Sequence, residues 1–150
     1  MAERIIRPDS KDIADCHPYL IARWPLVRDM FKQIMQNDLF LTSTYRSPET
    51  QAKLYAQGRT TPGQIVTSID GVSRKSFHNF YPARAFDVCV DMDLTDAVKP
   101  SWREELYKPL GYIAREVGLI WGGGWTSFKD MPHLQIPRSV ELEILEAEKR

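Results

Sequence analysis

Net charge, paired cysteines and long apolar runs are all absent from this 150-residue sequence, and each absence excludes a class of protein. The 20 basic residues are balanced by 20 acidic ones, whereas nucleic-acid-binding proteins usually carry a basic excess. No apolar run approaches the roughly 18 residues of a membrane-spanning helix. We therefore expect a partner that is neither nucleic acid nor a membrane.

The two cysteines and the first residues of the chain indicate the compartment in which the protein is kept. Cys16 and Cys89 lie far apart and form no C-x-x-C motif, which favours a reducing compartment. The first residues, M-A-E-R-I-I-R-P-D-S, lack the apolar core of a signal peptide. We expect a monomer that is made and kept in the host cytoplasm until another factor releases it.

Apolar periodicity predicts four helices within one domain spanning residues 1–150. Apolar residues at three- and four-residue spacing predict a helix over 20–35, in which Pro25 marks a kink or boundary. Ser47 and Pro48 predict the start of a second helix that ends near Ala56. The other helices are expected over 101–117, closed by Gly118, and over 139–149, with Leu142 and Leu145 facing inward.

Short runs of strand-forming residues separate these helices, at 39–45, 85–92, 119–121 and 133–136. In the second run, alternation places Ala85, Asp87, Cys89 and Asp91 on one face. Because helices and strands alternate without a regular βαβ repeat, we expect an α+β fold with a small, mostly antiparallel sheet flanked by helices. Residues 59–75 read as a long loop, a feature that is often functional.

Histidine is scarce, and two of the three histidines stand in polar, loop-like surroundings. His17, before Pro18, is best interpreted as a surface or hydrogen-bonded structural residue. His78 and His133, with Asp87 nine residues after His78, make two imidazoles and one carboxylate, the type of set that holds a catalytic zinc ion with one open position. Spacing alone is a weak signal, because many chains offer such triples.

Four sequence blocks resemble the zinc D-alanyl-D-alanine carboxypeptidase and L-alanyl-D-glutamate endopeptidase family. The first is S-F-H-N-F-Y-P-A-R-A-F-D (76–87), which is similar to that family's S-x-H…A-x-D motif. The others are D-M-P-H (130–133), T-S-T-Y-R-S-P-E-T-Q (42–51), and W-G-G-G-W followed by F-K-D (121–130), the last similar to the phage endolysin branch. The resemblance covers roughly 18–137 and leaves the predicted helix at 139–149 outside it.

Two positions depart from the common pattern of this family. The usual first motif has a glycine and a spacing of seven from histidine to aspartate, whereas here the spacing is nine and Pro82 stands near the glycine's place. Asp130 stands where the carboxypeptidases usually have glutamate, which favours the endopeptidase branch.

The resemblance implies a hedgehog/D-Ala-D-Ala-peptidase-like fold and a Zn2+ ion held by His78, Asp87 and His133. It further implies Asp130 as general base, with the alternative that Asp130 caps a helix or orients His133. Arg46 would bind a substrate carboxylate or the oxyanion, or else form a salt bridge at a strand end.

Other side chains near these motifs are expected to have structural or substrate-binding roles. Ser76 would support the site by hydrogen bonding, and Gln51 would either do the same or face solvent. Trp121 and Trp125 flank three glycines as core residues of a tight turn or as the wall of a substrate groove. The acidic run Asp91, Asp93 and Asp96 reads as a solvated loop, with a cation site as the less favoured alternative.

The leading hypothesis is a phage-type endolysin that cleaves the L-alanyl-D-glutamate bond of peptidoglycan stem peptides. The alternatives are a D-alanyl-D-alanine carboxypeptidase or dipeptidase of the same fold, and a non-catalytic cell-wall-binding or virion structural module. A serine hydrolase is disfavoured because the sequence has no G-x-S-x-G motif.

Overall fold

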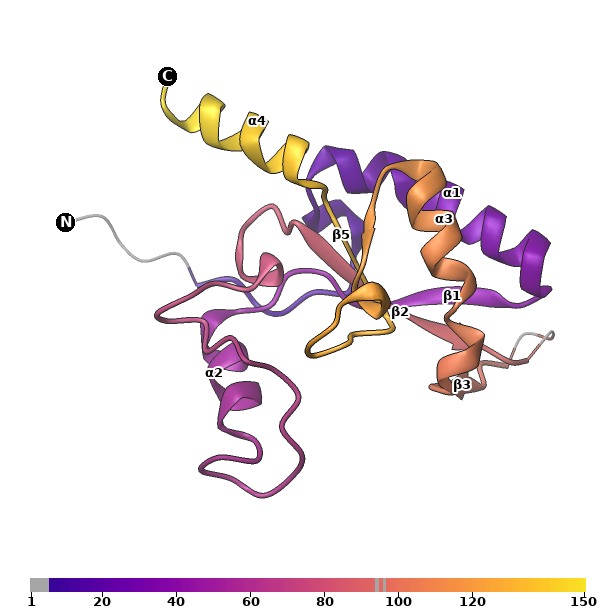
Figure 1. Ribbon diagram of the computed structural model, residues 1–150, viewed down its shortest axis with the longest axis horizontal. Helices are drawn as coiled ribbons and strands as arrows, with labels where there is room; N and C mark the ends of the chain where they lie inside the picture. The colour runs from indigo at the N-terminus through magenta and orange to yellow at the C-terminus, as the bar shows by residue number, and fades with distance from the viewer. Residues whose placement is uncertain (1–5, 94, 96) are drawn as a thin grey trace.

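The computed structural model describes residues 6–93, 95 and 97–150. The fold is a small sheet with helices packed against it (Figure 1). The helices are α1 (Pro18–Met35), α2 (Pro48–Ala56), α3 (Pro109–Val117) and α4 (Arg138–Glu148). The strands are β1 (Asp38–Ser43), β2 (Ala85–Asp91), β3 (Pro100–Ser101), β4 (Ile120–Trp121) and β5 (His133–Gln135). Single 3-10 turns are η1 (Ile13–Asp15), η2 (Phe77–Asn79), η3 (Glu104–Leu106) and η4 (Gly122–Gly124).

All strand pairs in the sheet are antiparallel, with the order β1-β2-β5-β4 and β3 paired to the far end of β2. β2 is therefore the central strand. The expected α+β fold with a small antiparallel sheet is confirmed. Strands β3 and β4 have only two residues each, so most of the sheet's pairing lies between β1, β2 and β5.

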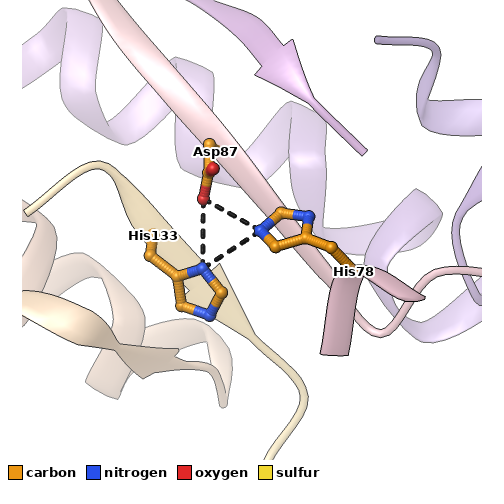
Figure 2. Close-up of side chains that lie close together, drawn as sticks. All are labelled: His78, Asp87 and His133. Atoms are coloured by element: carbon orange, nitrogen blue, oxygen red, sulfur yellow. Dashed lines mark hydrogen bonds and ion pairs between the residues drawn. The ribbon is translucent and has the colours of Figure 1, made fainter. Parts of the chain in front are cut away.

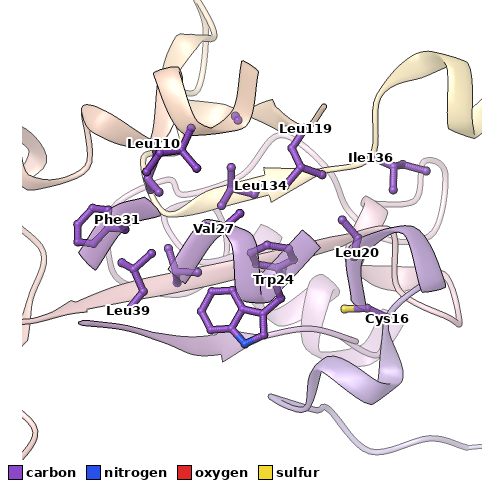
Figure 3. Packing of buried hydrophobic residues seen from close by; sticks show 14 of the residues in the cluster. Cys16, Leu20, Trp24, Val27, Phe31, Leu39, Leu110, Leu119, Leu134 and Ile136 are labelled. Atoms are coloured by element: carbon purple, nitrogen blue, oxygen red, sulfur yellow. The ribbon is translucent and has the colours of Figure 1, made fainter. Parts of the chain in front are cut away.

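One face of the sheet carries the hydrophobic core (Figure 3). Phe86, Val88 and Val90 of β2 point to this face, where α1 and α3 cover them. Leu20, Val27 and Phe31 repeat at helical spacing along α1 and are fully buried there. Strand alternation sends Ala85, Asp87, Cys89 and Asp91 to the opposite face, as the sequence predicted.

Three of the helices begin with a proline in their first turn, where a missing N–H costs no hydrogen bond. Ser47 caps α2 through its side chain, as predicted, and the α2 range agrees with the expected one. Pro25 lies inside α1, and the helix continues through it. Among the described residues, no helix combines the length and apolarity needed to cross a lipid bilayer.

The helix expected over 101–117 is shorter than predicted. Pro109 has no N–H and sets a new first turn, so α3 begins there, while Ser101 pairs with Val90 in the sheet. The inward orientation predicted for Leu142 and Leu145 is wrong: these side chains are 46% and 38% exposed. Val140 is the buried residue of α4, because the helix projects away from the sheet (Figure 1).

Candidate metal centre and its cleft

His78, Asp87 and His133 meet on the face of the sheet opposite the core (Figure 2). His78 Nε2 lies 3.1 Å from Asp87 Oδ1 and 3.2 Å from His133 Nδ1, and His133 Nδ1 lies 3.0 Å from Asp87 Oδ1. Ligand atoms placed tetrahedrally at about 2.0–2.1 Å from a zinc ion are about 3.3–3.4 Å apart. The three side chains can therefore hold a metal ion.

Each of the three residues is placed by a different element. Asp87 and His133 face each other directly across the β2–β5 ladder. His78 lies in η2, where Ser76 accepts a hydrogen bond from the His78 backbone N–H and Asn79 accepts one from the Ser76 N–H, so the N-terminal end of this turn is capped reciprocally. The cluster therefore combines a rigid strand pair with one capped turn.

The hydrogen bonds of the two imidazoles leave the right nitrogens for a metal ion. His78 Nδ1 donates to the Thr44 carbonyl oxygen at 2.7 Å, so Nε2 is the nitrogen that faces Asp87 and could bind a metal ion. His133 Nε2 donates to Gln135 Oε1 at 2.8 Å, which leaves Nδ1 directed at the same point. Two nitrogens and one carboxylate oxygen converge as a result.

Asp87 and His133 of the cluster change each other's pKa values. Burial alone would raise the pKa of Asp87, but the charge of His78 and hydrogen bonds from both imidazoles outweigh it and hold that pKa well below its usual value. Burial would lower the pKa of His133, yet the hydrogen bond and charge of Asp87 raise it. The carboxylate is thus ionised at neutral pH, as a metal ligand must be.

Arg46 and Gln51 form a connected pair beside the cluster. Arg46 Nη2 lies 3.4 Å from Asp87 Oδ2, and Arg46 Nη1 donates to Gln51 Oε1 at 3.0 Å. Gln51 is buried and donates to the Ile69 carbonyl oxygen at 2.9 Å. Gln51 therefore does not face solvent; it ties the guanidinium to the loop that follows α2. The salt bridge considered for Arg46 exists, and Arg46 also lines the cleft.

Asp130 lies next to the cluster, with its Oδ2 3.7 Å from His133 Nδ1. Its backbone N–H donates to the Gly122 carbonyl oxygen at 3.0 Å. A Cβ at position 122 would meet the Asp130 carbonyl oxygen at 2.5 Å, so this close approach requires glycine. Partial burial and the negative charge of Asp87 outweigh the positive charge of His133 and raise the pKa of the Asp130 carboxyl, which makes it a better proton acceptor than an ordinary aspartate.

The two tryptophans that flank the three glycines have different surroundings. Trp121 donates from Nε1 to the Met131 carbonyl oxygen at 2.7 Å and packs so closely that Gly111 and Gly123 have no room for a Cβ. Trp125 lies with its ring 5.2 Å from the His133 ring and lines the cleft. Trp121 thus fits the structural interpretation, and Trp125 fits the groove-wall interpretation.

A cleft of about 960 Å3 surrounds the cluster, near the upper end of the range of roughly 300–1,000 Å3 for small-molecule sites. Two of its sides differ in chemistry. The first side, called the polar wall, comes from Arg46, α2 and the loop after it. Its polar residues are Arg46, Gln51, Gln57, Thr67, Ser68, Arg74 and Lys75, and they lie among the apolar residues Leu54, Val66 and Ile69. Three aromatic side chains from other segments, Trp102, Trp125 and Phe128, also line the cleft, and they are called the aromatic wall.

The remaining candidates have structural contacts. His17 is the N-cap of α1, where its Nδ1 accepts from the Tyr19 N–H at 3.1 Å. Asp91 Oδ1 accepts from the backbone N–H groups of Asp93 and Lys99, so this carboxylate holds its loop together. Asp96 lies outside the described residues.

Sequence reasoning missed Gln135, the hydrogen-bond partner of His133. The signal was present, because residues two apart on a strand point to the same face. It also missed Arg74, Lys75, Trp102 and Phe128 as cleft residues, although the first two lie in the loop over 59–75 that was expected to be functional.

Comparisons with known proteins agree with this geometry. Residues 70–136, which contain the whole cluster, match the family model described as D-alanyl-D-alanine carboxypeptidase. The chain is 37% identical over 108 residues to the peptidoglycan L-alanyl-D-glutamate endopeptidase CwlK of Bacillus subtilis (strain 168). That alignment covers 66% of this chain and 60% of the Bacillus protein.

The fold has a solved counterpart in the L-Ala D-Glu endopeptidase ChiX of Serratia marcescens. The two structures superpose with a TM-score of 0.57 over 86% of each chain, at 20% identity, so this likeness concerns the fold. The family model and the Bacillus relative confirm the resemblance to the D-alanyl-D-alanine carboxypeptidase and L-alanyl-D-glutamate endopeptidase family, and the Serratia structure confirms the expected fold.

Proposed function

We propose that this protein is a zinc-dependent peptidoglycan peptidase that cleaves the L-alanyl-D-glutamate bond of stem peptides. The observation that carries the proposal is the convergence of His78 Nε2, His133 Nδ1 and Asp87 Oδ1 beside Asp130 in an open cleft. The bond assignment is supported by the similarity of this chain to the L-alanyl-D-glutamate endopeptidase CwlK of Bacillus subtilis.

The donor set fits zinc, since two imidazole nitrogens and a carboxylate oxygen are ligands that zinc accepts with a fourth position left open. Bound there, the ion would supply Lewis-acid chemistry and lower the pKa of a nearby water. Asp130 would take the proton of the attacking water and pass it to the leaving amine as the peptide bond breaks. The raised pKa of Asp130 suits both halves of this task.

The polar wall favours a substrate that carries carboxylates. Arg46 lies beside the cluster, and Arg74 and Lys75 line the same cleft. In the described part of the chain, no carboxylate lies within ion-pair distance of Arg74 or Lys75. A stem peptide has a free carboxylate on the D-glutamate next to the scissile bond, and a guanidinium fork is suited to hold it. Ser76 and Gln51 would support Arg46 and His78 rather than react.

The phage-type assignment is part of the same proposal. It is supported by the similarity of residues 121–130 to the phage endolysin branch. An endolysin acts on the wall after release from the host cytoplasm, and we propose that location and timing for this chain, acting as a monomer.

Digestion of purified peptidoglycan tests the proposal. Wild type, Asp130→Asn and a chelated sample are compared, with the zinc content of each determined and the cut bonds identified by mass spectrometry. We expect soluble peptides from zinc-loaded wild type, and a fall of about 10^2–10^4-fold in kcat for Asp130→Asn with zinc retained. Asp29→Asn, on the exposed surface of α1, is the matched control.

The same digest separates the alternatives. The family model is described as D-alanyl-D-alanine carboxypeptidase, and release of terminal D-alanine alone would establish that activity instead. A zinc-loaded wild type that cleaves no peptidoglycan bond would contradict both activities and favour a wall-binding module.

A further inference from the structure

The aromatic wall of the cleft is more exposed than its residue types favour. Trp102 is 56% exposed and Phe128 is 50% exposed, while Trp125 is half-buried. Isolated exposed aromatics are ordinary, but these three line one cavity together with His133 and Asp130. An aromatic surface concentrated at a reaction site indicates a ligand group that covers it.

Trp102 is held in place from behind. Its ring stacks parallel to the Tyr107 ring, with 6.2 Å between centroids. Tyr107 is buried; its hydroxyl donates to the Ser101 carbonyl oxygen at 2.7 Å and accepts from the Val90 N–H at 3.1 Å. The indole is therefore fixed to the sheet, which lowers the entropic cost of binding a flat ligand against it.

Phe128 lines the cleft with its backbone in an unfavourable conformation. Its φ is 51°, in the left-handed region that bulky side chains rarely adopt. The ring remains half exposed, so burial within the protein does not offset this strain. Strained residues of this kind concentrate at ligand-binding positions.

One residue of each wall contacts a different member of the cluster, and this favours one direction for a bound stem peptide. Arg46 contacts Asp87 from the polar wall, whereas Trp125 contacts the ring of His133. Figure 1 shows α2 with its loop and the 122–132 segment as separate projections from the sheet. With the D-glutamate carboxylate on the polar side, the acyl side of the scissile bond extends toward the aromatic wall.

Only one amino acid, L-alanine, separates that bond from the lactyl group that links the peptide to its sugar. An extended residue spans at most about 3.3–3.6 Å, so the sugar ring must lie within the cleft or at its edge. A pyranose presents a face of C–H groups that packs on aromatic rings, with hydroxyls left at the rim. An unattached peptide offers no such group at this position.

We propose that Trp102, Trp125 and Phe128 form a sugar subsite that binds the pyranose ring carrying the stem peptide. This inference rests on the proposed function. With this subsite, the enzyme recognises the sugar–peptide junction as well as the peptide.

Two substrates that share the scissile bond test the subsite: a disaccharide–tetrapeptide and the same tetrapeptide with the lactyl group but no sugar. We measure kcat/KM for both with wild type, Trp102→Ala and Phe128→Ala. The expected result is a wild-type preference for the sugar-bearing substrate, and a fall of about three- to tenfold in that preference in each variant. Tyr112→Ala, an exposed aromatic on α3 outside the cleft, should keep the wild-type ratio.

The outcomes separate the two levels of the proposal. A wild type that cleaves neither substrate contradicts the proposed function itself. Cleavage of both substrates with an equal kcat/KM, or with a ratio that neither variant changes, overturns the sugar subsite alone. Because Trp102→Ala removes a stacking partner of Tyr107, thermal melts accompany each variant, and Phe128→Ala decides the question if Trp102→Ala does not fold.

Discussion

At the residue scale, the orientation of His133 depends on one neighbour, Gln135. The amide oxygen of Gln135 accepts the Nε2 proton of His133, which leaves Nδ1 for a metal ion. Residues that orient a metal-ligating histidine typically contribute about 10–100-fold in metal affinity. Gln135 is therefore a positioning residue that acts through its hydrogen bond to His133.

We predict that Gln135→Leu lowers zinc affinity by about 10–100-fold, because His133 loses its acceptor. Gln135→Glu should retain affinity, since a carboxylate also accepts the Nε2 proton. Competition with a chelator of known affinity measures this, and Gln33→Leu on the exposed surface of α1 serves as the control. Equal affinity in Gln135→Leu and wild type would show that His133 needs no such partner.

The three residues of the candidate cluster could be predicted from the sequence, whereas the groups that surround and orient them could not. His78, Asp87 and His133 stand out because histidine is scarce and their motifs resemble a known family. The Thr44 carbonyl oxygen that fixes the tautomer of His78 belongs to the backbone, so no residue type marks it. Trp102 escaped notice because only the folded chain brings it to the same cavity as Trp125.

At the scale of elements, the N-terminal end of α2 is stabilised by a segment from the start of the chain. Asp9 Oδ1 accepts from the Ser47 N–H at 2.7 Å, and its Oδ2 accepts from the Thr50 hydroxyl at 2.6 Å. A negative charge is favourable at the N-terminus of a helix. This contact matters for the site because α2 carries Gln51 and begins directly after Arg46.

The contact predicts a specific pH dependence of stability. Partial burial would raise the pKa of Asp9, but the hydrogen bonds from Ser47 and Thr50 outweigh it and hold that pKa below its ordinary value of 3.8. A lowered folded-state pKa contributes stability above the unfolded value, and this contribution is lost as pH falls through the folded pKa. The melting temperatures of wild type and Asp9→Asn should therefore differ at neutral pH and converge below about pH 4.

Thermal melts between pH 2 and pH 7 measure this convergence. Asp29→Asn changes the same charge on the exposed surface of α1 and should show no such pattern. A constant difference between wild type and Asp9→Asn over the whole range would assign the effect of Asp9 to something other than its ionised form.

Element types were more predictable than element boundaries. α2 agrees with its prediction because Ser47 and Pro48 are strong local signals. The start of α3 was misplaced because the apolar pattern continues through 101–108, although Pro109 restarts the helix and Ser101 joins the sheet. Leu142 and Leu145 were predicted to be buried because periodicity identifies an apolar stripe but not whether another element covers it.

At the scale of the whole molecule, the core and the metal cluster occupy opposite faces of one sheet. The buried side chains of α1, α3 and the inner face of β2 pack without any contribution from His78 or His133. A chain of this length can also bury roughly 68–70% of its unfolded surface without a metal. Folding and metal binding should therefore be separable.

We predict that chelated protein still unfolds in one cooperative thermal transition, at a lower temperature than the zinc-loaded form. Added zinc should raise the melting temperature in a concentration-dependent way, because an ion that binds only the folded state stabilises it by mass action. Calorimetry of chelated and reloaded samples measures both effects. A chelated form without a cooperative transition would show that folding requires a metal ion at the cluster.

The wide sequence separation within the cluster has a consequence for the order of folding. His133 is 46 residues from Asp87 and 55 from His78, and contacts across such distances form only after the entropy of closing the intervening chain has been overcome. A nascent chain with its helices formed but β5 not yet paired to β2 presents at most His78 and Asp87. The three candidate ligands therefore come together only once β5 has joined the sheet, so a metal ion that uses all three would bind late in folding.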